Sequence, residues 1–251
     1  MAVEPTERPR PRLLAIHGLG ATGAVWGPLI AHLGAGWDVV APDLPGHGSA
    51  PWTGDYTVGS LTASMSGHVD DDEPVVVVGH SLGGAVGLAL ASGFFRPRVV
   101  AAVAVGVKVV WTDEDVVGMA KVAARGVRWF DSEDEAAERA LRQAGLAGLV
   151  DDLADAVVEE DGRWRAAQDP ATFAQRELDM AGLMAAARCP VILGAGEHDP
   201  MVTADDLATH TDRPRILDGR GHNVQVEDPA WVAALLDEVV AEADGAARPA
   251  H

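Results

Sequence analysis

The chain has 251 residues, of which 48% are hydrophobic, so it can bury the core of one large α/β domain and is not a mainly disordered protein. Its 38 acidic residues outnumber its 19 basic ones and give a formal charge of −19, which disfavours nucleic acids and anionic membranes as partners. No apolar run reaches the roughly 18 residues of a membrane span, and the first residues lack the apolar stretch of a signal peptide. Cys189 is the single cysteine, so no disulfide forms within the chain, and we expect a cytoplasmic protein.

Short runs of β-branched residues alternate with longer helical patterns, which is typical of an α/β protein with a mostly parallel sheet covered by helices on both faces. Residues 75–78 are all valine, as expected for a central strand buried on both sides. We predict about six strands, at residues 12–17, 38–41, 75–79, 99–105, 191–194 and 215–217. We predict helices that begin after Gly23, near Val58, at Leu82, at Thr203 and at Pro229, the last with Asp228 as its N-cap.

The alternation stops at residues 108–187, where Ala, Leu and Val recur at helical spacing. Within this segment, Ser132 and the acidic residues around it are typical of an N-cap and the first turn of a helix. We therefore predict a helical cap, residues 108–187, inserted between the fourth and fifth strands of a core formed by residues 1–107 and 188–251. The cap is expected above the carboxyl ends of the strands, because the chain leaves the fourth strand there. Residues 1–11 and 244–251 are expected to be frayed tails.

The sharpest motif is Gly79-His80-Ser81-Leu82-Gly83, between the four-valine strand and an apolar helix. A G-x-S-x-G sequence at such a junction forms a tight turn that raises the serine hydroxyl above the sheet, at the positive end of the helix. Small residues two positions before and after the serine are needed to avoid clashes, and the two glycines supply them. The motif predicts that Ser81 is a nucleophile.

A serine hydroxyl needs a base to activate it, and the base needs an acid to orient it. In this strand–turn–helix context, the expected chain order is serine, acid, histidine. Asp199 follows the fifth predicted strand in a sharp turn before Pro200, and His222 follows the sixth in a glycine-containing loop. We predict Asp199 as the acid and His222 as the base. Asp113 and Glu114, after the fourth strand, are the alternative acids.

Two further motifs precede the serine: His17-Gly18-Leu19-Gly20 after the first strand, and Asp43-Leu44-Pro45-Gly46-His47-Gly48-Ser49 after the second. With the three motifs above, this ordered set resembles the α/β-hydrolase superfamily, in particular its capped, bacterial esterase-like branch, over roughly residues 13–240. The resemblance implies a Ser81–His222–Asp199 triad and an oxyanion hole made by the backbone N–H groups of Leu19 and Leu82. It implies a structural role for residues 43–49.

A serine nucleophile forms an acyl-enzyme, which suits small-molecule substrates that are carboxylic esters, thioesters or lactones. The same triad also serves perhydrolases and carbon–carbon bond hydrolases, and the same fold serves small-molecule receptors, so these functions stay open. No cofactor is expected, and no residue cluster predicts a metal site. The candidate substrate-binding residues are His17, His80, Trp111, Trp129 and Phe130.

Overall fold

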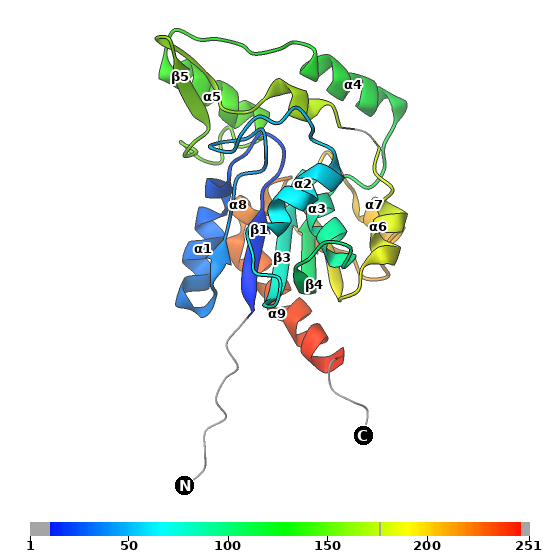
Figure 1. Cartoon of the computed structure of the whole chain (residues 1–251). Coiled ribbons are helices and arrows are strands. Elements are labelled where there is room, and N and C mark those ends of the chain that lie inside the picture. Colours follow the sequence, from blue (N-terminus) through cyan, green and yellow to red (C-terminus); the bar gives the residue numbers. More distant parts are fainter. Residues whose placement is uncertain (1–10, 176, 247–251) are drawn as a thin grey trace.

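The computed structural model describes residues 11–175 and 177–246, and its main element is a sheet of six strands in the order β2-β1-β3-β4-β7-β8 (Figure 1). All five strand pairings in this sheet are parallel. The strands are β1 (Arg12–Ile16), β2 (Val39–Val40), β3 (Pro74–His80), β4 (Arg98–Val105), β7 (Val191–Gly196) and β8 (Arg215–Leu217). The six strands predicted from the sequence are therefore confirmed.

Helices cover both faces of this sheet, because alternate side chains of its strands point to opposite faces. Val76 and Val78 of β3 pack in the cluster that contains residues of α1 and α9, whereas Val75 and Val77 pack in the cluster that contains residues of α2 and α3. The core helices are η1 (Gly23–Trp26), α1 (Gly27–Leu33), η2 (Gly34–Gly36), α2 (Val58–Ser66), α3 (Leu82–Ala91), α7 (Ala204–Ala208), α8 (Val224–Glu227) and α9 (Pro229–Ala246).

The last helix begins where the sequence predicts it. The Asp228 carboxylate accepts a hydrogen bond from Trp231 N–H at 3.0 Å, and Pro229 is the first helical residue. Because α9 continues to Ala246, residues 244–246 are helical and not frayed. Residues 1–10 and 247–251, the rest of the predicted tails except for Pro11, lie outside the described residues. Among residues 11–175 and 177–246, no helix has the length and apolarity that crossing a bilayer demands.

Residues 108–187 contain both helices and a β-hairpin, so the expectation of an all-helical segment was wrong here. Asp161 and Gly162 connect the two antiparallel hairpin strands with φ angles of 52° and 74°, and two positive φ angles are what a two-residue type I′ turn requires. The elements of the insertion are α4 (Asp113–Ala123), α5 (Glu133–Gln143), β5 (Val157–Glu160), β6 (Arg163–Ala166), η3 (Pro170–Phe173) and α6 (Met180–Ala186).

The insertion contacts loops that follow the carboxyl ends of β1, β2 and β8. Figure 1 shows α4, α5 and β5 together at one end of the molecule, opposite the last turn of α9. The contacts include hydrogen bonds from Thr22 Oγ1 to Ala154 O (2.9 Å), from Asp169 N to Gly46 O (2.8 Å), from Trp52 Nε1 to Ala167 O (3.0 Å) and from Asn223 Nδ2 to Gly145 O (3.0 Å). This edge of the sheet is where open α/β folds bind their ligands.

Candidate active site

Ser81 lies at the junction of β3 and α3 in a strained backbone conformation. Its φ of 51° and ψ of −119° are in a region that non-glycine residues rarely adopt, and such strain gathers at functional sites. A β-carbon at Gly79 would overlap the Gly83 carbonyl, and one at Gly83 would overlap the Ile16 carbonyl. The Ser81 N–H donates to Val105 O at 2.9 Å, which attaches the turn to β4. The glycines predicted around this serine are therefore required by close backbone packing.

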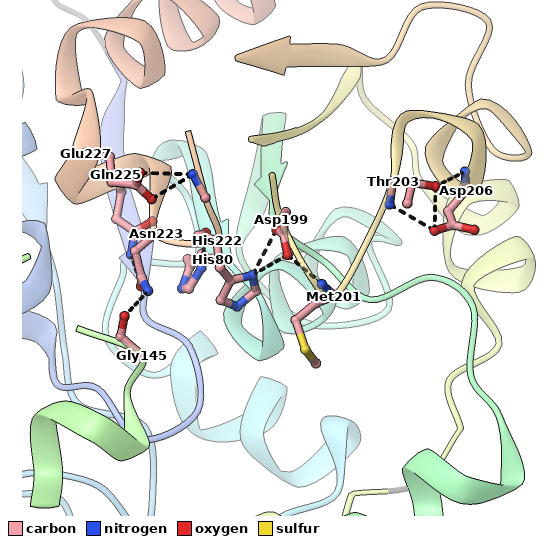
Figure 2. A network of polar contacts seen from close by, with 11 residues as sticks. His80, Gly145, Asp199, Met201, Thr203, Asp206, His222, Asn223, Gln225 and Glu227 are labelled. Carbon is pink, nitrogen blue, oxygen red and sulfur yellow. Dashed lines mark hydrogen bonds and ion pairs between the residues drawn. The ribbon is translucent and has the colours of Figure 1, made fainter. Parts of the chain in front are cut away.

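Figure 2 shows the His222 ring between Asp199 and His80. The distances from His222 Nδ1 to the two Asp199 carboxylate oxygens are 2.9 and 3.0 Å. The Asp199 side chain has no exposed surface, and it also accepts a hydrogen bond from Met201 N–H at 2.8 Å. An ionised carboxylate only accepts hydrogen bonds, so in the neutral ring this contact favours the tautomer with the proton on Nδ1 and the lone pair on Nε2. The ring is thus held in the tautomer that a general base needs.

His80 and Gly106 connect the serine turn to this histidine–aspartate pair. The rings of His80 and His222 have centroids 4.6 Å apart, and His80 Nε2 lies 3.0 Å from the backbone oxygen of His222. A β-carbon on Gly106 would come within 3.3 Å of both the His222 ring and the Asp199 carboxylate. No hydrogen bond joins Ser81 Oγ to His222 among the described residues, and catalytic hydrogen bonds are often long before substrate binds.

The loop that carries His222 is held from both sides by residues that the sequence analysis did not single out. Gly221 N–H donates to the Glu227 carboxylate at 2.9 and 3.2 Å, and the buried Asn223 donates its side-chain amide to Gly145 O at 3.0 Å. Glu227 follows the loop in α8, and Gly145 follows α5 of the insertion. In the sequence, the position of Asn223 directly after the predicted base was the one indication that it could hold this loop.

The two predicted oxyanion-hole residues lie in segments next to Ser81. Leu82 is the first residue of α3, so its N–H has no acceptor within the helix. Leu19 follows Gly18, where a β-carbon would come within 3.1 Å of Ser81 Cβ, so its loop passes beside the serine. Within the described chain, neither N–H donates a hydrogen bond. Neither N–H thus has an acceptor within the described residues, as an oxyanion-hole donor requires.

The histidine candidates for substrate binding are buried. His17 has no exposed surface, accepts a hydrogen bond from Leu44 N–H at 2.9 Å on Nε2, and donates from Nδ1 to Gly18 O at 2.8 Å. Burial lowers the pKa of His17, so the ring is neutral and joins the two loops after β1 and β2. His80 is only 3% exposed. Both rings are thus buried, and their substrate contact remains a prediction.

The aromatic candidates do not form one pocket. Trp129 and Phe130 line a cavity of about 470 Å³ in the insertion, together with Phe173. Trp111 lies elsewhere, and its ring N–H donates to Lys108 O at 3.1 Å. The lining residues of this cavity do not include Ser81, and most of its polar lining is arginine. Trp129 and Phe130 therefore share one cavity, and Trp111 does not line it.

Other candidates for chemistry are absent or inert. Asp113 and Glu114 are exposed in the first turn of α4, and within the described residues neither hydrogen-bonds to His222. Burial raises the pKa of the Cys189 thiol to about 11, so this residue is a protonated thiol and a poor nucleophile. In the described part of the chain, no group of three or more His, Cys, Asp or Glu side chains is positioned to hold a metal ion.

Two curated relatives are similar to this chain over part of their length. Lipase LipV of Mycobacterium tuberculosis is 44% identical over 93 residues, which are 36% of this chain and 34% of that protein. The pimeloyl-[acyl-carrier protein] methyl ester esterase of Neisseria meningitidis serogroup A is 38% identical over 81 residues, which are 32% of this chain and 25% of that protein. The matches thus span about a third or less of the length of these relatives.

Solved structures are similar over nearly the whole chain. E-2-(acetamidomethylene)succinate hydrolase has a TM-score of 0.75 at 21% identity, covering 92% of this chain and 91% of that one. An esterase of Mycobacterium tuberculosis has a TM-score of 0.68 at 24% identity, covering 92% and 84%. At such identities the likeness shows the fold. The sequence model of the "Alpha/beta hydrolase family" matches residues 13–235, and the chain therefore belongs to this family.

Proposed function

We propose that this protein is a serine hydrolase that cleaves a carboxylic ester, thioester or lactone through an acyl-enzyme, with Ser81, His222 and Asp199 as its triad. One observation carries the proposal: His222 is hydrogen-bonded through Nδ1 to the fully buried carboxylate of Asp199, beside a serine in a strained turn. This combination supports a base with its lone pair on Nε2, next to a raised hydroxyl.

In this mechanism, Ser81 Oγ attacks the substrate carbonyl while His222 Nε2 takes the hydroxyl proton. The negative charge that develops on the carbonyl oxygen is stabilised by the N–H groups of Leu19 and Leu82 and by the N-terminus of α3. The carbon–oxygen or carbon–sulfur bond then breaks, and His222 returns the proton to the leaving group. A water molecule, deprotonated by His222, hydrolyses the acyl-enzyme and restores Ser81.

Two further findings support this function. The partial relatives are a lipase and a methyl ester esterase by name. The insertion, residues 108–187, contacts the loops around Ser81 and His222, so it is suited to act as a cap that limits water at the acyl-enzyme and selects the substrate. We propose that residues 1–107 and 188–251 form the catalytic core beneath it.

The test is hydrolysis of p-nitrophenyl esters of graded acyl length by the purified chain. Ser81→Ala and His222→Ala should each lower kcat/KM on the order of 10⁴-fold, because each removes an essential part of one catalytic unit. Ser66→Ala, at a half-buried serine on α2 whose hydroxyl donates to Ala63 O, is the matched control and should keep wild-type activity. A folded Ser81→Ala variant with near-wild-type activity would contradict the mechanism.

Labelling with a fluorophosphonate separates an enzyme from a receptor on the same fold. An activated serine forms a covalent phosphonate ester, so intact-mass analysis should show one adduct, on Ser81, that is missing from the His222→Ala variant. Slow labelling together with negligible turnover of all esters would indicate a receptor that keeps the triad without using it.

A further inference from the structure

The cavity in the insertion is lined by five arginines and by no acidic residue. Arg125 and Arg128 follow α4, Arg139 lies on α5, and Arg163 and Arg165 share one face of β6 because alternate residues of a strand point the same way. The whole chain has 19 basic residues and a formal charge of −19. A large share of its positive charge is thus gathered in one hollow of an otherwise acidic molecule.

Most of these arginines have no counter-charge. Arg165 lies 3.5 Å from the Glu160 carboxylate, but the other four make no ion pair with any described residue. Arg128 and Arg163 lie over the aromatic rings of Phe130 and Trp129 instead, at 4.9 and 5.8 Å from the ring centroids. Burial, and next the charges of Arg128, Arg142 and Arg125, lower the pKa of Arg139. Like charges held together in this way repel one another, and a bound anion would relieve that repulsion.

The walls of the cavity fit an organic anion better than a bare ion. Guanidinium groups bind the oxygens of phosphates and carboxylates through paired hydrogen bonds. Trp129, Phe130 and Phe173 add flat apolar surface beside the charges. A volume of about 470 Å³ lies within the range of sites for small molecules.

One wall of the cavity also touches the loop beside Ser81. Gln143, at the end of α5, lines the cavity, and a β-carbon on Gly20 would come within 2.9 Å of the Gln143 carbonyl carbon. Gly20 directly follows Leu19, whose N–H we assign to the oxyanion hole. The cavity and the loop that carries the proposed oxyanion N–H are therefore separated by a single wall, which Gln143 and Gly20 form.

We propose that the arginine cavity binds the anionic end of the molecule on which Ser81 acts, an oxyanion group joined to an apolar body. The part of the inference in which Ser81 acts on the bound molecule rests on the proposed function. The part in which the cavity binds an anion does not. Both a phosphate and a carboxylate carry the required chemistry, and the experiments below distinguish them.

Binding is measured by calorimetric titration of the Ser81→Ala protein with 1-naphthyl phosphate, 1-naphthoate and the neutral 1-naphthol. At least one anion should bind saturably and about tenfold or more tightly than naphthol, and the tighter anion identifies the preferred oxyanion. Arg139→Gln and Arg163→Gln, each added to Ser81→Ala, should weaken the anion about tenfold. Arg96→Gln is the matched control, because Arg96 is 84% exposed on the core and pairs with Asp71. Equal binding of all three probes, or no effect of the cavity variants, would overturn the proposal.

Turnover is measured with p-nitrophenyl monoesters of dicarboxylic acids and with the fatty acyl esters of the same length. At one chain length, the ester with a terminal carboxylate should have the higher kcat/KM, and Arg139→Gln should reduce that preference about tenfold, mainly through KM. An unchanged preference in Arg139→Gln would refute the link between cavity and substrate. Failure of the wild-type chain to cleave any ester would count against the proposed function, while the titration still decides whether the cavity binds an anion.

Discussion

His80 precedes the proposed nucleophile in the chain and contacts the proposed base in space. Its Nε2 donates to His222 O at 3.0 Å, whereas its buried Nδ1 has no hydrogen-bond partner among the described residues. Burial and, next, the charge of His222 hold the pKa of His80 well below its ordinary value. The ring is therefore neutral at the pH of an esterase assay and fixes the backbone of His222. We propose that it is a positioning residue.

Two substitutions at this residue separate positioning from proton transfer. His80→Leu should lower kcat about tenfold to a hundredfold, because a misplaced base costs catalysis steeply, whereas His80→Gln keeps an N–H at similar reach and should lose less. Because His80 is neutral, the apparent pKa of the pH–kcat/KM profile should stay the same in both variants. The measurement is p-nitrophenyl acetate turnover between pH 5 and 9. If His80→Gln lost the limb on which kcat/KM rises with pH, the base would be His80 instead.

The proposed site was visible in the sequence only where a local turn or the chain order demanded a residue type. Ser81 was predicted from two glycines that the tight turn requires, and the pairing of Asp199 with His222, 23 residues later, follows from the order of strands in a parallel sheet. Glu227 was not predicted, because a glutamate that caps a loop looks like any exposed charge until its partner, Gly221 N–H, is known.

Among the elements, the β5–β6 hairpin shows why a short element escapes a sequence pattern. Its strands have four residues each, several of them charged, so no apolar alternation marks them. The hairpin is completed from outside: Phe130 N–H donates to Trp164 O at 2.7 Å, and Trp164 N–H donates to Phe130 O at 2.9 Å. Such a distant pairing has no local signature, although the Asp-Gly pair at the turn is itself a hairpin signal.

The same change at two exposed glycines should have opposite effects on stability. Gly162 has a φ of 74°, which alanine adopts only with strain, so Gly162→Ala should lower the free energy of unfolding by about 1 kcal/mol. Gly118 lies inside α4, where alanine is the better helix former, so Gly118→Ala should raise it by about 1 kcal/mol. A β-carbon at either position meets no atom within 4 Å, so packing does not enter the comparison. Urea denaturation measures the free energy of unfolding of both variants. A stabilised Gly162→Ala variant would contradict the type I′ turn.

At the scale of the whole molecule, the sheet was predictable and the arginine cavity was not. Strands buried on both faces must be uniformly apolar, so residues such as Val76 and Val78 reveal them directly. The cavity instead joins residues from Val122 to Phe173, which belong to α4, α5, the hairpin, η3 and the loops between them. Each of its arginines in isolation looks like an ordinary surface residue. Only the folded arrangement shows that they converge.

The net charge of the molecule predicts how salt should change its stability. A formal charge of −19 makes the folded chain repel itself at pH 8, and the Debye length falls from about 30 Å at 0.01 M salt to about 8 Å at 0.15 M. Screening should therefore stabilise the fold by about 1 kcal/mol, or about 2–4 °C in Tm for a chain of this size. Screening also weakens exposed ion pairs such as Arg96–Asp71, but this costs little stability because surface ion pairs contribute little to it.

Thermal melts in NaCl at two pH values test this charge effect. The rise in Tm should appear at pH 8 and shrink at pH 5, close to the sequence pI of about 4.6, because the net charge that salt screens has nearly vanished there. Lithium, sodium and potassium chloride should act alike, since screening depends on ionic strength and not on the ion. An equal rise at both pH values would contradict the electrostatic account, because only a mechanism independent of net charge, such as general strengthening of apolar burial by salt, acts equally at both.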